Sequence, residues 1–422
     1  MTTIRCVART LSLIAAAACC ALVCEAADAP ARTRMSNADL VARGEYLALI
    51  GDCNACHTVP GKQPYTGGFA MPTPFGTLYT PNITPDAETG IGKWSADDFW
   101  RALHDGKSKD GSYLYPAFPY TNYTKVTRAD SDAMYAFFMA LRPVSQPNKA
   151  QELRFPYNQR NLLVGWRALY FKPGVQKENP KQTKQWNRGA YLVEGLGHCS
   201  ACHGSRNILG AVKEDDVAGG LIPVQNWYAP SLTSNRETGL GDWEIKEIVD
   251  LLRTGVSTRG AAVGPMSAVV YHSLQSLTIT DLTAMAIYLK TQVQAVPTEP
   301  PQVKPGIEHT ETMMTEGKAI YEKQCANCHQ PRGEGVPRIY PPLANNESIL
   351  MPYPINALRM VMLGGFPPST EGNPRPYGMP PFQDLTNQEV ASVVTFIRQS
   401  WGNNAPAVAP AEVDGARGVP TH

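Results

Sequence analysis

The sequence predicts a mainly α-helical protein built from three tandem copies of one small unit with long loops. One pentapeptide form occurs three times, as CNACH (Cys53–His57), CSACH (Cys199–His203) and CANCH (Cys325–His329). A stripe of apolar and aromatic residues at helical spacing precedes each copy, and further helical patterns follow it. The 36 prolines and 35 glycines among 422 residues indicate that much of the remaining chain is loop and turn.

The three units share one order of features: helix, CxxCH, loop, helix, loop and closing helix. A glycine stands eight to ten residues before the first cysteine of each motif. Each closing helix is expected to begin at a threonine that has Asp or Glu three residues later, which is a helix-capping pattern. We place the units at 36–145, 182–296 and 310–402.

The segments outside these units have distinct compositions. The connection 146–181 contains LLVGWRALYFKPG (Leu162–Gly174), whose apolar character predicts packing between domains. A docking surface for another subunit or for the membrane interface is the alternative. Residues 297–309 form a proline-rich linker, which is expected to be stiff. The tail 403–422 is rich in Ala, Pro and Gly and is predicted to be disordered.

Residues 1–26 have the pattern of a secretory signal peptide. Arg5 and Arg9 supply a positive start, 11–23 a short apolar core, and 24–26 a cleavage region with small residues. The core is short for a membrane span, so an uncleaved anchor is the weaker alternative. No later stretch approaches 18 apolar residues, and we expect a mature chain that is not an integral membrane protein.

Charge argues against one large class of partners. The chain has 38 basic and 37 acidic side chains, a formal net charge of +1. A protein whose main partner is nucleic acid normally has a strongly basic field. We therefore expect no nucleic-acid partner.

The cysteines point to chemistry on the thiols themselves. Four of the ten cysteines fall within the predicted signal peptide, and the other six all belong to the three CxxCH motifs. None is left for a structural disulfide, although an exported chain would enter an oxidising compartment.

Of the functions that CxxCH serves, covalent haem attachment uses every residue of the motif. Structural zinc needs four ligands, and each unit offers only two cysteines and one adjacent histidine. A redox dithiol needs a βαβ context and leaves the histidine unexplained. Haem c uses two thiols for thioether bonds and the following imidazole for the iron. The predicted sites are three covalently bound haem c groups on Cys53, Cys56, Cys199, Cys202, Cys325 and Cys328, with His57, His203 and His329 as axial iron ligands.

The sixth iron ligand is expected on the loop before each closing helix. A methionine thioether is a neutral ligand that favours Fe(II) and raises the reduction potential. Met266 lies twelve residues before Thr278 in the second unit, and Met379 lies seven before Thr386 in the third. The corresponding residue of the first unit is Phe118, which cannot bind iron.

Other residues of the first unit do not fit the vacant position well. Met134 aligns with Met285 of the second unit, and both are expected to be core residues. Met139 lies at the end of the closing helix. Met71 lies on the histidine-side loop, and His104 reads as a helix-surface residue. We hypothesise that the first haem is five-coordinate or ligated from an atypical position.

The order of elements resembles class I cytochrome c, in which the first and last helices cross beside the haem. Essentially the whole mature chain is similar to the tri-haem cytochrome c subunits of bacterial membrane-bound dehydrogenases. The resemblance is carried by the three CxxCH motifs, NITPDAETGIGKW, LYPAFPYTNYTK, FPYNQRNLLVGW, GGLIPVQNWYAPSLT, VGPMSAVVYHSLQSLT, YGMPPF and RQSWGNNAP.

The resemblance implies three tandem class I cytochrome c-like domains and an electron-transfer role in a respiratory chain. It implies a catalytic dehydrogenase partner of flavin, pyrroloquinoline quinone or molybdenum type, with this chain as the non-catalytic subunit. Electrons would pass to ubiquinone at the periplasmic side of the cytoplasmic membrane, which the chain would contact peripherally. The family's haem ligands carry over to the residues named above, with Phe118 as the departure.

Two other functions are compatible with the motifs. One is a soluble multihaem carrier that feeds a terminal oxidase. The other is a peroxidase-like haem enzyme with an open first haem, although no obvious acid–base pair flanks that loop. The sequence does not identify the substrate of the partner.

Overall fold

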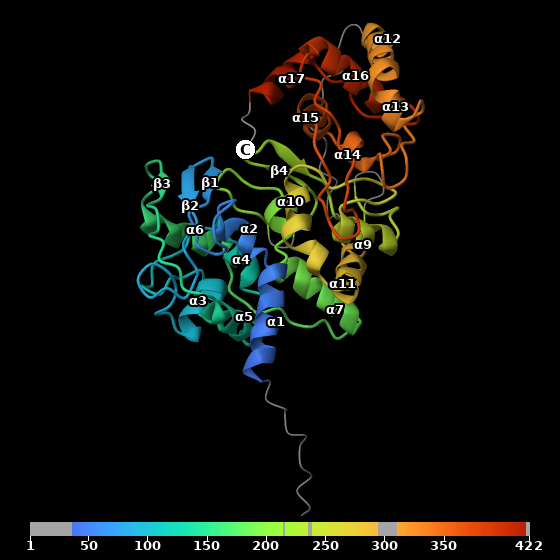
Figure 1. Cartoon of the computed structure of the whole chain (residues 1–422). Coiled ribbons are helices and arrows are strands. Elements are labelled where there is room, and N and C mark those ends of the chain that lie inside the picture. Colours follow the sequence, from blue (N-terminus) through green and yellow to red (C-terminus); the bar gives the residue numbers. More distant parts are fainter. Residues whose placement is uncertain (1–35, 214–215, 235–238, 294–309, 419–422) are drawn as a thin grey trace, which may run out of the picture. The chain divides into compact units, whose positions relative to one another are not determined.

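The computed structural model describes residues 36–213, 216–234, 239–293 and 310–418, and residues 37 onward cluster as one unit (Figure 1). The predicted signal peptide 1–26 and linker 297–309 lie outside the described residues. The described chain is rich in helix and poor in strand, as the sequence predicts.

The first repeat begins with α1 and closes with α5. Its elements are α1 (Asn37–Ile50), α2 (Cys53–His57), β1 (Ala70–Thr73), β2 (Gly76–Tyr79), α3 (Ala96–Asp105), α4 (Tyr120–Tyr123) and α5 (Arg128–Ala140). The connection that follows contains β3 (Glu152–Leu153), a 3-10 turn (Arg160–Leu162) and α6 (Leu163–Tyr170). Strands β1, β2 and β3 form an antiparallel sheet in which Met71 pairs with Leu78 and Gly76 with Leu153.

The second repeat runs from α7 to α11. Its elements are α7 (Lys184–Ala190), a π-helical turn (Tyr191–Leu196), α8 (Ser200–His203), β4 (Gly220–Ile222), β5 (Trp227–Ala229), α9 (Ile245–Thr254), α10 (Pro265–His272), a 3-10 turn (Leu274–Ser276) and α11 (Ile279–Leu289). Strands β4 and β5 pair antiparallel, with Leu221 opposite Tyr228.

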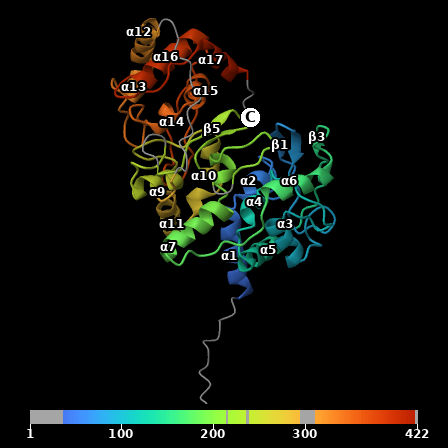
Figure 2. The same ribbon diagram turned by 180° about the vertical axis from the view of Figure 1, so that it is seen from behind.

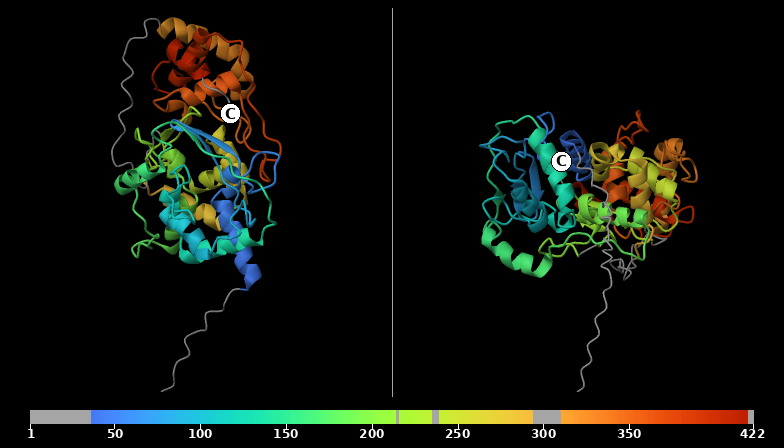
Figure 3. Two further views of the ribbon diagram at one scale, coloured as in Figure 1. Left: turned by 90° about the vertical axis from the view of Figure 1, so that its left-hand side faces the viewer. Right: turned by 90° about the horizontal axis from the view of Figure 1, so that it is seen from below.

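The third repeat has the same framework of helices. Its elements are α12 (Thr310–Ile320), a π-helical turn (Tyr321–Cys325), α13 (Ala326–His329), α14 (Glu347–Leu350), α15 (Ile355–Leu363), α16 (Asn387–Gln399) and α17 (Pro410–Arg417). Figure 3 shows these helices, in orange and red, gathered into a group of their own.

In each repeat the first helix packs against the closing helix: α1 on α5, α7 on α11 and α12 on α16. The glycine before each motif lies at the point of contact. A Cβ on Gly44 would overlap the backbone carbonyl of Ala133, and the same relation joins Gly189 to Ala284 and Gly317 to Ser392. Glycine is therefore needed at these positions because the two backbones touch, and not because of an unusual dihedral angle.

The predicted caps of the closing helices are confirmed. The side chains of Thr127, Thr278 and Thr386 accept hydrogen bonds from the backbone N–H three residues later. In α16 the Glu389 carboxylate also accepts from the backbone N–H of Thr386, completing a capping box.

Among the described residues, the buried apolar side chains form two clusters rather than three. One runs continuously through the first two repeats and contains residues such as Leu47, Phe138, Leu192 and Met285. The other belongs to the third repeat. The first two repeats therefore share a single core, which the pattern of repeats did not predict.

Reciprocal polar contacts reinforce this shared core. The hydroxyl of Tyr46 in α1 donates to Asp281 of α11 (2.8 Å), where Arg188 of α7 also binds. In the mirror arrangement, Tyr191 donates to Asp130 of α5 (2.5 Å), where Arg43 of α1 also binds.

Two expectations about the connecting segments need correction. The segment 162–174 contacts both of the first two repeats but is not buried between them, because α6 has no buried residue and lies beside the β1–β2–β3 sheet (Figure 2). The Arg167 guanidinium lies over the ring of Tyr113 in the first repeat (4.5 Å), and the Trp166 indole N–H donates to the Leu209 carbonyl in the second (3.0 Å). The side chains of Val164 and Leu169, in contrast, are exposed.

The described part of the tail 403–422 is not disordered. Residues 410–417 form α17, which packs against α16 with Val408 and Val413 fully buried. The buried guanidinium of Arg398 in α16 donates to the carbonyl of Pro406 (3.0 Å), and Asn403 donates to Leu343 (2.9 Å). These few buried groups anchor a segment whose overall composition resembles that of disordered chains.

Candidate haem sites

Each CxxCH motif occupies one helical turn at the end of a first helix. The first forms α2, and the others span α8 and α13 together with the preceding cysteine. All six cysteines are free and half-buried. A turn of this kind places the first and second cysteine on one side, three residues apart, with the histidine next in sequence.

The three motif histidines have one hydrogen-bonding arrangement. Nδ1 of His57 lies 2.8 Å from the carbonyl oxygen of Pro81, and Nδ1 of His203 lies 2.7 Å from that of Pro230. Nδ1 of His329 lies 3.0 Å from the carbonyl of Pro341. A carbonyl can only accept, so Nδ1 carries the proton and Nε2 keeps its lone pair for a metal.

Burial keeps these imidazoles neutral. It lowers the pKa of His57, His203 and His329, and the hydrogen bond to the proline carbonyl opposes this only in part. A neutral imidazole of fixed tautomer is the form that binds iron.

The thiols do not have the properties of a redox dithiol. Burial raises the pKa of Cys53, Cys56 and Cys199 to about 12, and that of Cys325 to about 11. Reactive dithiols need the opposite, a lowered thiol pKa. Among the described residues, no three His, Cys, Asp or Glu side chains converge as a zinc site would require.

Met266 lies at the start of α10. Gly264 adopts φ 56°, Pro265 occupies the first helical turn, and Met266 follows, half-buried against the core of the first two repeats. The ring of Trp227 packs where a Cβ on Gly264 would lie. The backbone before Met266 is therefore held firmly on a loop that follows α9.

Met379 is held by backbone pairing. Its N–H donates to the Gly365 carbonyl (2.8 Å), and its carbonyl accepts from the Gly365 N–H (3.0 Å). Gly364, with φ 66°, allows this approach, because a Cβ there would overlap the Met379 carbonyl. The Met379 side chain is half-buried against the core of the third repeat, together with Cys325.

In the first repeat, Phe118 occupies a comparable place. It is half-buried against the shared core, and its ring lies 5.3 Å from that of Tyr123, whose hydroxyl donates to the Gly51 carbonyl beside the motif (2.8 Å). An aromatic ring there packs but offers no lone pair to iron.

The other candidate ligands of the first repeat all lie within helices or a strand. Met134 is 1% exposed within α5, and Met139 packs against the same core. His104 stacks on Trp100 (4.6 Å) and its Nδ1 lies 2.9 Å from an Asp105 carboxylate oxygen. Met71 belongs to β1, opposite Leu78.

The first and second motifs lie next to each other. Helix α2 packs against α10, which carries Met266. Asn122 donates to Ser200 within the second motif (2.9 Å), and the ring of His198 lies 5.6 Å from that of Tyr123. The Asp52 carboxylate, beside the first motif, contributes to the raised pKa of both Cys56 and Cys202.

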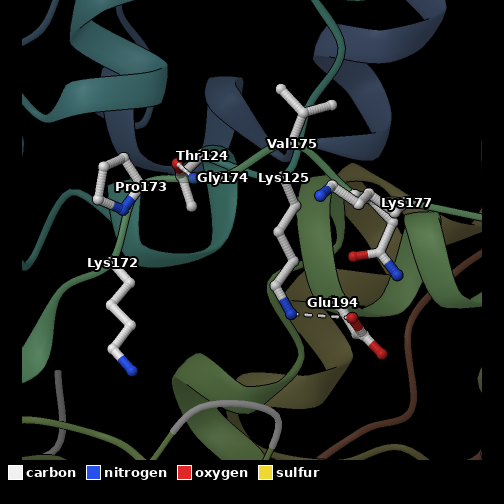
Figure 4. A pocket seen from close by; sticks show the side chains of 9 residues that line it. Thr124, Lys125, Lys172, Pro173, Gly174, Val175, Lys177 and Glu194 are labelled. Atoms are coloured by element: carbon white, nitrogen blue, oxygen red, sulfur yellow. Dashed lines mark hydrogen bonds and ion pairs between the residues drawn. The ribbon is translucent and has the colours of Figure 1, made fainter.

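A polar pocket near this junction is unrelated to the motifs. It is lined by Lys125, Lys172, Lys177 and Glu194 among others, and Lys125 binds Glu194 across it (2.8 Å; Figure 4).

These arrangements fit haem c. Each motif provides two free thiols and one imidazole whose Nε2 is available, and two of the three repeats hold a methionine on the expected loop. The sequence did not reveal the proline carbonyls, although a proline follows each motif by 12 to 27 residues. The available signal was a proline directly before NIT (82–84) in the first repeat and directly before SLT (231–233) in the second.

Known proteins resemble this chain over most of its length. Residues 314–401 match the family model described as Cytochrome c. The chain is 41% identical over 391 residues to the cytochrome c subunit of alcohol dehydrogenase (quinone) from Gluconobacter oxydans (strain 621H), covering 88% of this chain and 80% of that protein.

Two further relatives have comparable coverage. The gluconate 2-dehydrogenase cytochrome c subunit of Pantoea cypripedii is 41% identical over 394 residues, covering 89% of each chain. The fructose dehydrogenase cytochrome subunit of Gluconobacter japonicus is 34% identical over 395 residues, covering 86% of this chain and 79% of that protein. With this identity and coverage, and with a cytochrome c domain in its last third, the chain belongs to the family of cytochrome c subunits of alcohol, gluconate and fructose dehydrogenases.

Proposed function

We propose that this chain is a tri-haem electron-transfer subunit that passes electrons from a dehydrogenase catalytic subunit to ubiquinone at the periplasmic side of the cytoplasmic membrane. The observation that carries the proposal is the recurrence of one arrangement: a CxxCH turn whose histidine Nδ1 faces a proline carbonyl, at His57, His203 and His329. Three equal arrangements support three haem c groups rather than one.

The proposed domains are three class I cytochrome c-like units at 36–145, 182–296 and 310–402. Their support is the glycine contact between first and last helices, which recurs at Gly44, Gly189 and Gly317. The first two units act as one body, because they share a core.

The proposed iron ligands are His57, His203 and His329 on one side, with Met266 and Met379 on the other for the second and third haems. Haem c supplies a one-electron carrier whose potential follows its axial ligands. The protein orients each imidazole through the proline carbonyl, and its apolar core keeps water away. For the first haem we propose a five-coordinate or atypically ligated iron, because Phe118 cannot bind.

The contact of α2 with α10 supports direct electron transfer between the first and second haems. Residues of the third repeat also touch the second: Asn356 of α15 bridges the backbone N–H and carbonyl of Tyr228 (2.9 and 2.8 Å). The proposed path therefore runs through adjacent repeats.

The partner is proposed to be a catalytic dehydrogenase subunit, because relatives are named as cytochrome subunits of alcohol, gluconate and fructose dehydrogenases. Its cofactor is proposed to be flavin, pyrroloquinoline quinone or molybdenum, as the resemblance of the sequence implies. No described helix is long and apolar enough to cross a membrane. Export through the signal peptide and peripheral membrane contact are parts of the same proposal.

The test is purification of the native complex, followed by mass measurement and redox assay. The mass should correspond to three haems on the mature chain, and a cofactor-bearing subunit should accompany it. Its substrate should reduce the haems, and a short-chain ubiquinone should reoxidise them. A chain that is isolated without a dehydrogenase and is oxidised directly by a terminal oxidase would establish the soluble-carrier function instead. Peroxide turnover by the chain alone would indicate a peroxidase.

A further inference from the structure

The connection between the first two repeats exposes an unusually large set of apolar side chains. Phe155 is 79% exposed, Leu169 72% exposed, and Leu162 and Val164 are also on the outside. Ile208, on the loop after the second motif, is 92% exposed. We call these five residues the α6 surface.

The parts of the α6 surface are held together by direct contacts. The indole N–H of Trp166 in α6 donates to the Leu209 carbonyl (3.0 Å), which joins the Ile208 loop to the helix. On the other side, the ring of Tyr157 packs on that of Phe75 (4.5 Å), and Phe75 also lies against Gly210. The apolar side chains thus belong to one structured region made from three segments of the chain.

The charged residues of the segment around α6 are all basic. Residues 154–177 contain Arg154, Arg160, Arg167, Lys172 and Lys177 and no acidic residue, in a chain whose total is only +1. Lys172 and Lys177 line the polar pocket that follows α6, and Figure 4 shows Lys172 pointing away from the Lys125–Glu194 pair. The Ile208 loop carries an exposed apolar side chain but no net basic surface, because the Asp216 carboxylate accepts a hydrogen bond from Ser205 (2.7 Å) and Arg206 donates to the Ala201 carbonyl.

We propose that the α6 surface is the site at which this chain docks on an anionic phospholipid membrane. A short helix that exposes Leu and Val, is anchored by Trp and Tyr, and has only Lys and Arg as charged residues within 154–177 has the composition of interfacial membrane segments. The basic side chains are attracted to acidic headgroups, and the apolar ones enter the headgroup boundary. Cores of protein–protein interfaces are instead depleted in lysine. The inference rests on the proposed function, because a subunit that reduces ubiquinone must approach the bilayer.

The test uses the haem-loaded full chain and sedimentation with two kinds of vesicle, phosphatidylcholine alone and phosphatidylcholine mixed with phosphatidylglycerol. The wild type should bind the mixed vesicles, and binding should weaken as salt is raised. The variant Leu169→Ser/Ile208→Ser should bind about tenfold more weakly, since two apolar side chains no longer enter the lipid. The variant Lys172→Gln/Lys177→Gln should bind roughly twenty-five-fold more weakly, at about fivefold per lysine.

Matched controls change the same residue types elsewhere. Ile279→Ser removes a half-exposed isoleucine at the start of α11, and Lys62→Gln removes an exposed lysine of the first repeat. Both should bind vesicles as the wild type does. All these substitutions are at exposed positions, so an unchanged haem absorption spectrum should verify folding in each case.

Two results would overturn the inference. One is equal binding of wild type and both double variants to the mixed vesicles. The other is that the double variants no longer co-purify with the dehydrogenase subunit but still bind vesicles. The α6 surface would then be a protein interface. Reduction of the chain by its dehydrogenase in detergent solution is measured separately. If it is intact while vesicle binding is absent, only the membrane inference fails; if it is absent in the wild type, the proposed function fails.

Discussion

The chemistry of each proposed site depends on two side chains that come from different segments, an imidazole within CxxCH and a group on a later loop. The imidazole is oriented by a backbone carbonyl, so its tautomer does not depend on any other side chain. The second group differs between repeats: Met266 and Met379 offer sulfur, whereas Phe118 offers a ring. The proposed first haem should therefore differ in potential from the proposed second and third haems, although the three attachment turns are alike.

Removal of the methionine should affect one haem at a time. In Met379→Ala, the third haem should lose its His/Met spectrum, and its reduction potential should fall by on the order of 0.1 V, a fraction of the ~0.8 V range that axial ligands span. Met266→Ala should do the same to the second haem. Spectroelectrochemical titration measures both. Unchanged titrations in the two variants would refute these ligand assignments.

The reciprocal change is Phe118→Met. A thioether on the loop of the first repeat should add a third His/Met centre and raise the potential of the first haem. The same titration counts His/Met centres before and after. As a control, Met134→Ala removes a methionine that is buried within α5 and should leave the number of His/Met centres unchanged. If the wild type already has three identical low-spin centres, the proposed difference of the first haem is wrong.

At the scale of elements, the crossing of first and last helices decides where each CxxCH turn lies. The crossing requires a glycine because a Cβ would overlap a backbone carbonyl, as at Gly317 against Ser392. In Gly317→Ala the two helices must separate. The free energy of unfolding of the third repeat should therefore fall by about 1–3 kcal/mol.

Urea unfolding of the haem-loaded chain measures this effect. Gly415→Ala is the matched control, because α17 leaves open space around Gly415 and alanine is the better helix former there. Equal midpoints for Gly317→Ala and the wild type would show that the contact is not tight.

The hydrogen bonds that join α1 and α7 to the closing helices predict that the stability of the protein depends on pH. Burial raises the pKa of Asp281, but hydrogen bonds from Arg188 and Tyr46 outweigh it, so that pKa lies below its ordinary value. A carboxylate with a lowered folded-state pKa contributes stability above its unfolded pKa, which is lost as the pH falls. Below about pH 4, stability should therefore decline in the wild type.

In the variant Asp281→Asn, stability should decline less than in the wild type as the pH falls. At neutral pH it should be less stable by about 1–3 kcal/mol, because a charge-assisted pair is lost. Thermal unfolding across acidic and neutral pH tests both statements. Asp97→Asn, at an exposed surface pair with Arg128, should change little; parallel pH profiles for Asp281→Asn and the wild type would contradict the prediction.

At the scale of the whole molecule, the described residues of the first two repeats share one apolar core, and those of the third repeat form another. A chain that ends at residue 293 keeps the shared core of the first two repeats complete and should fold with two haems. A chain that ends at residue 145 exposes that core where Leu192 and Leu196 now pack, and it should be unstable or aggregate. Haem content and soluble yield of the two truncated chains measure this. A stable, monomeric 37–145 chain would show that the first repeat is independent.

Sequence reasoning was most successful where the relevant interactions are local. The caps at Thr127, Thr278 and Thr386 were predictable because the capping residues lie three positions apart. It was less successful for α6 and for the tail. The apolar composition of α6 predicts a buried segment, and the Ala- and Pro-rich composition of the tail predicts disorder. Whether Leu169 is covered, or Val413 finds a core, depends on distant segments that composition does not report.

By itself, the sequence located the three CxxCH motifs and predicted the attachment residues, three repeats and the loop on which each sixth ligand is expected. These follow from motifs of five residues and from spacing along one repeat, where covalent geometry and helical periodicity limit what neighbours can do. Only the tertiary structure decided which carbonyl orients each histidine, that two repeats share one core, and that α6 stays outside. Each of these depends on which surfaces come together when the chain folds, as with Tyr46 and Asp281, which are separated by 235 positions.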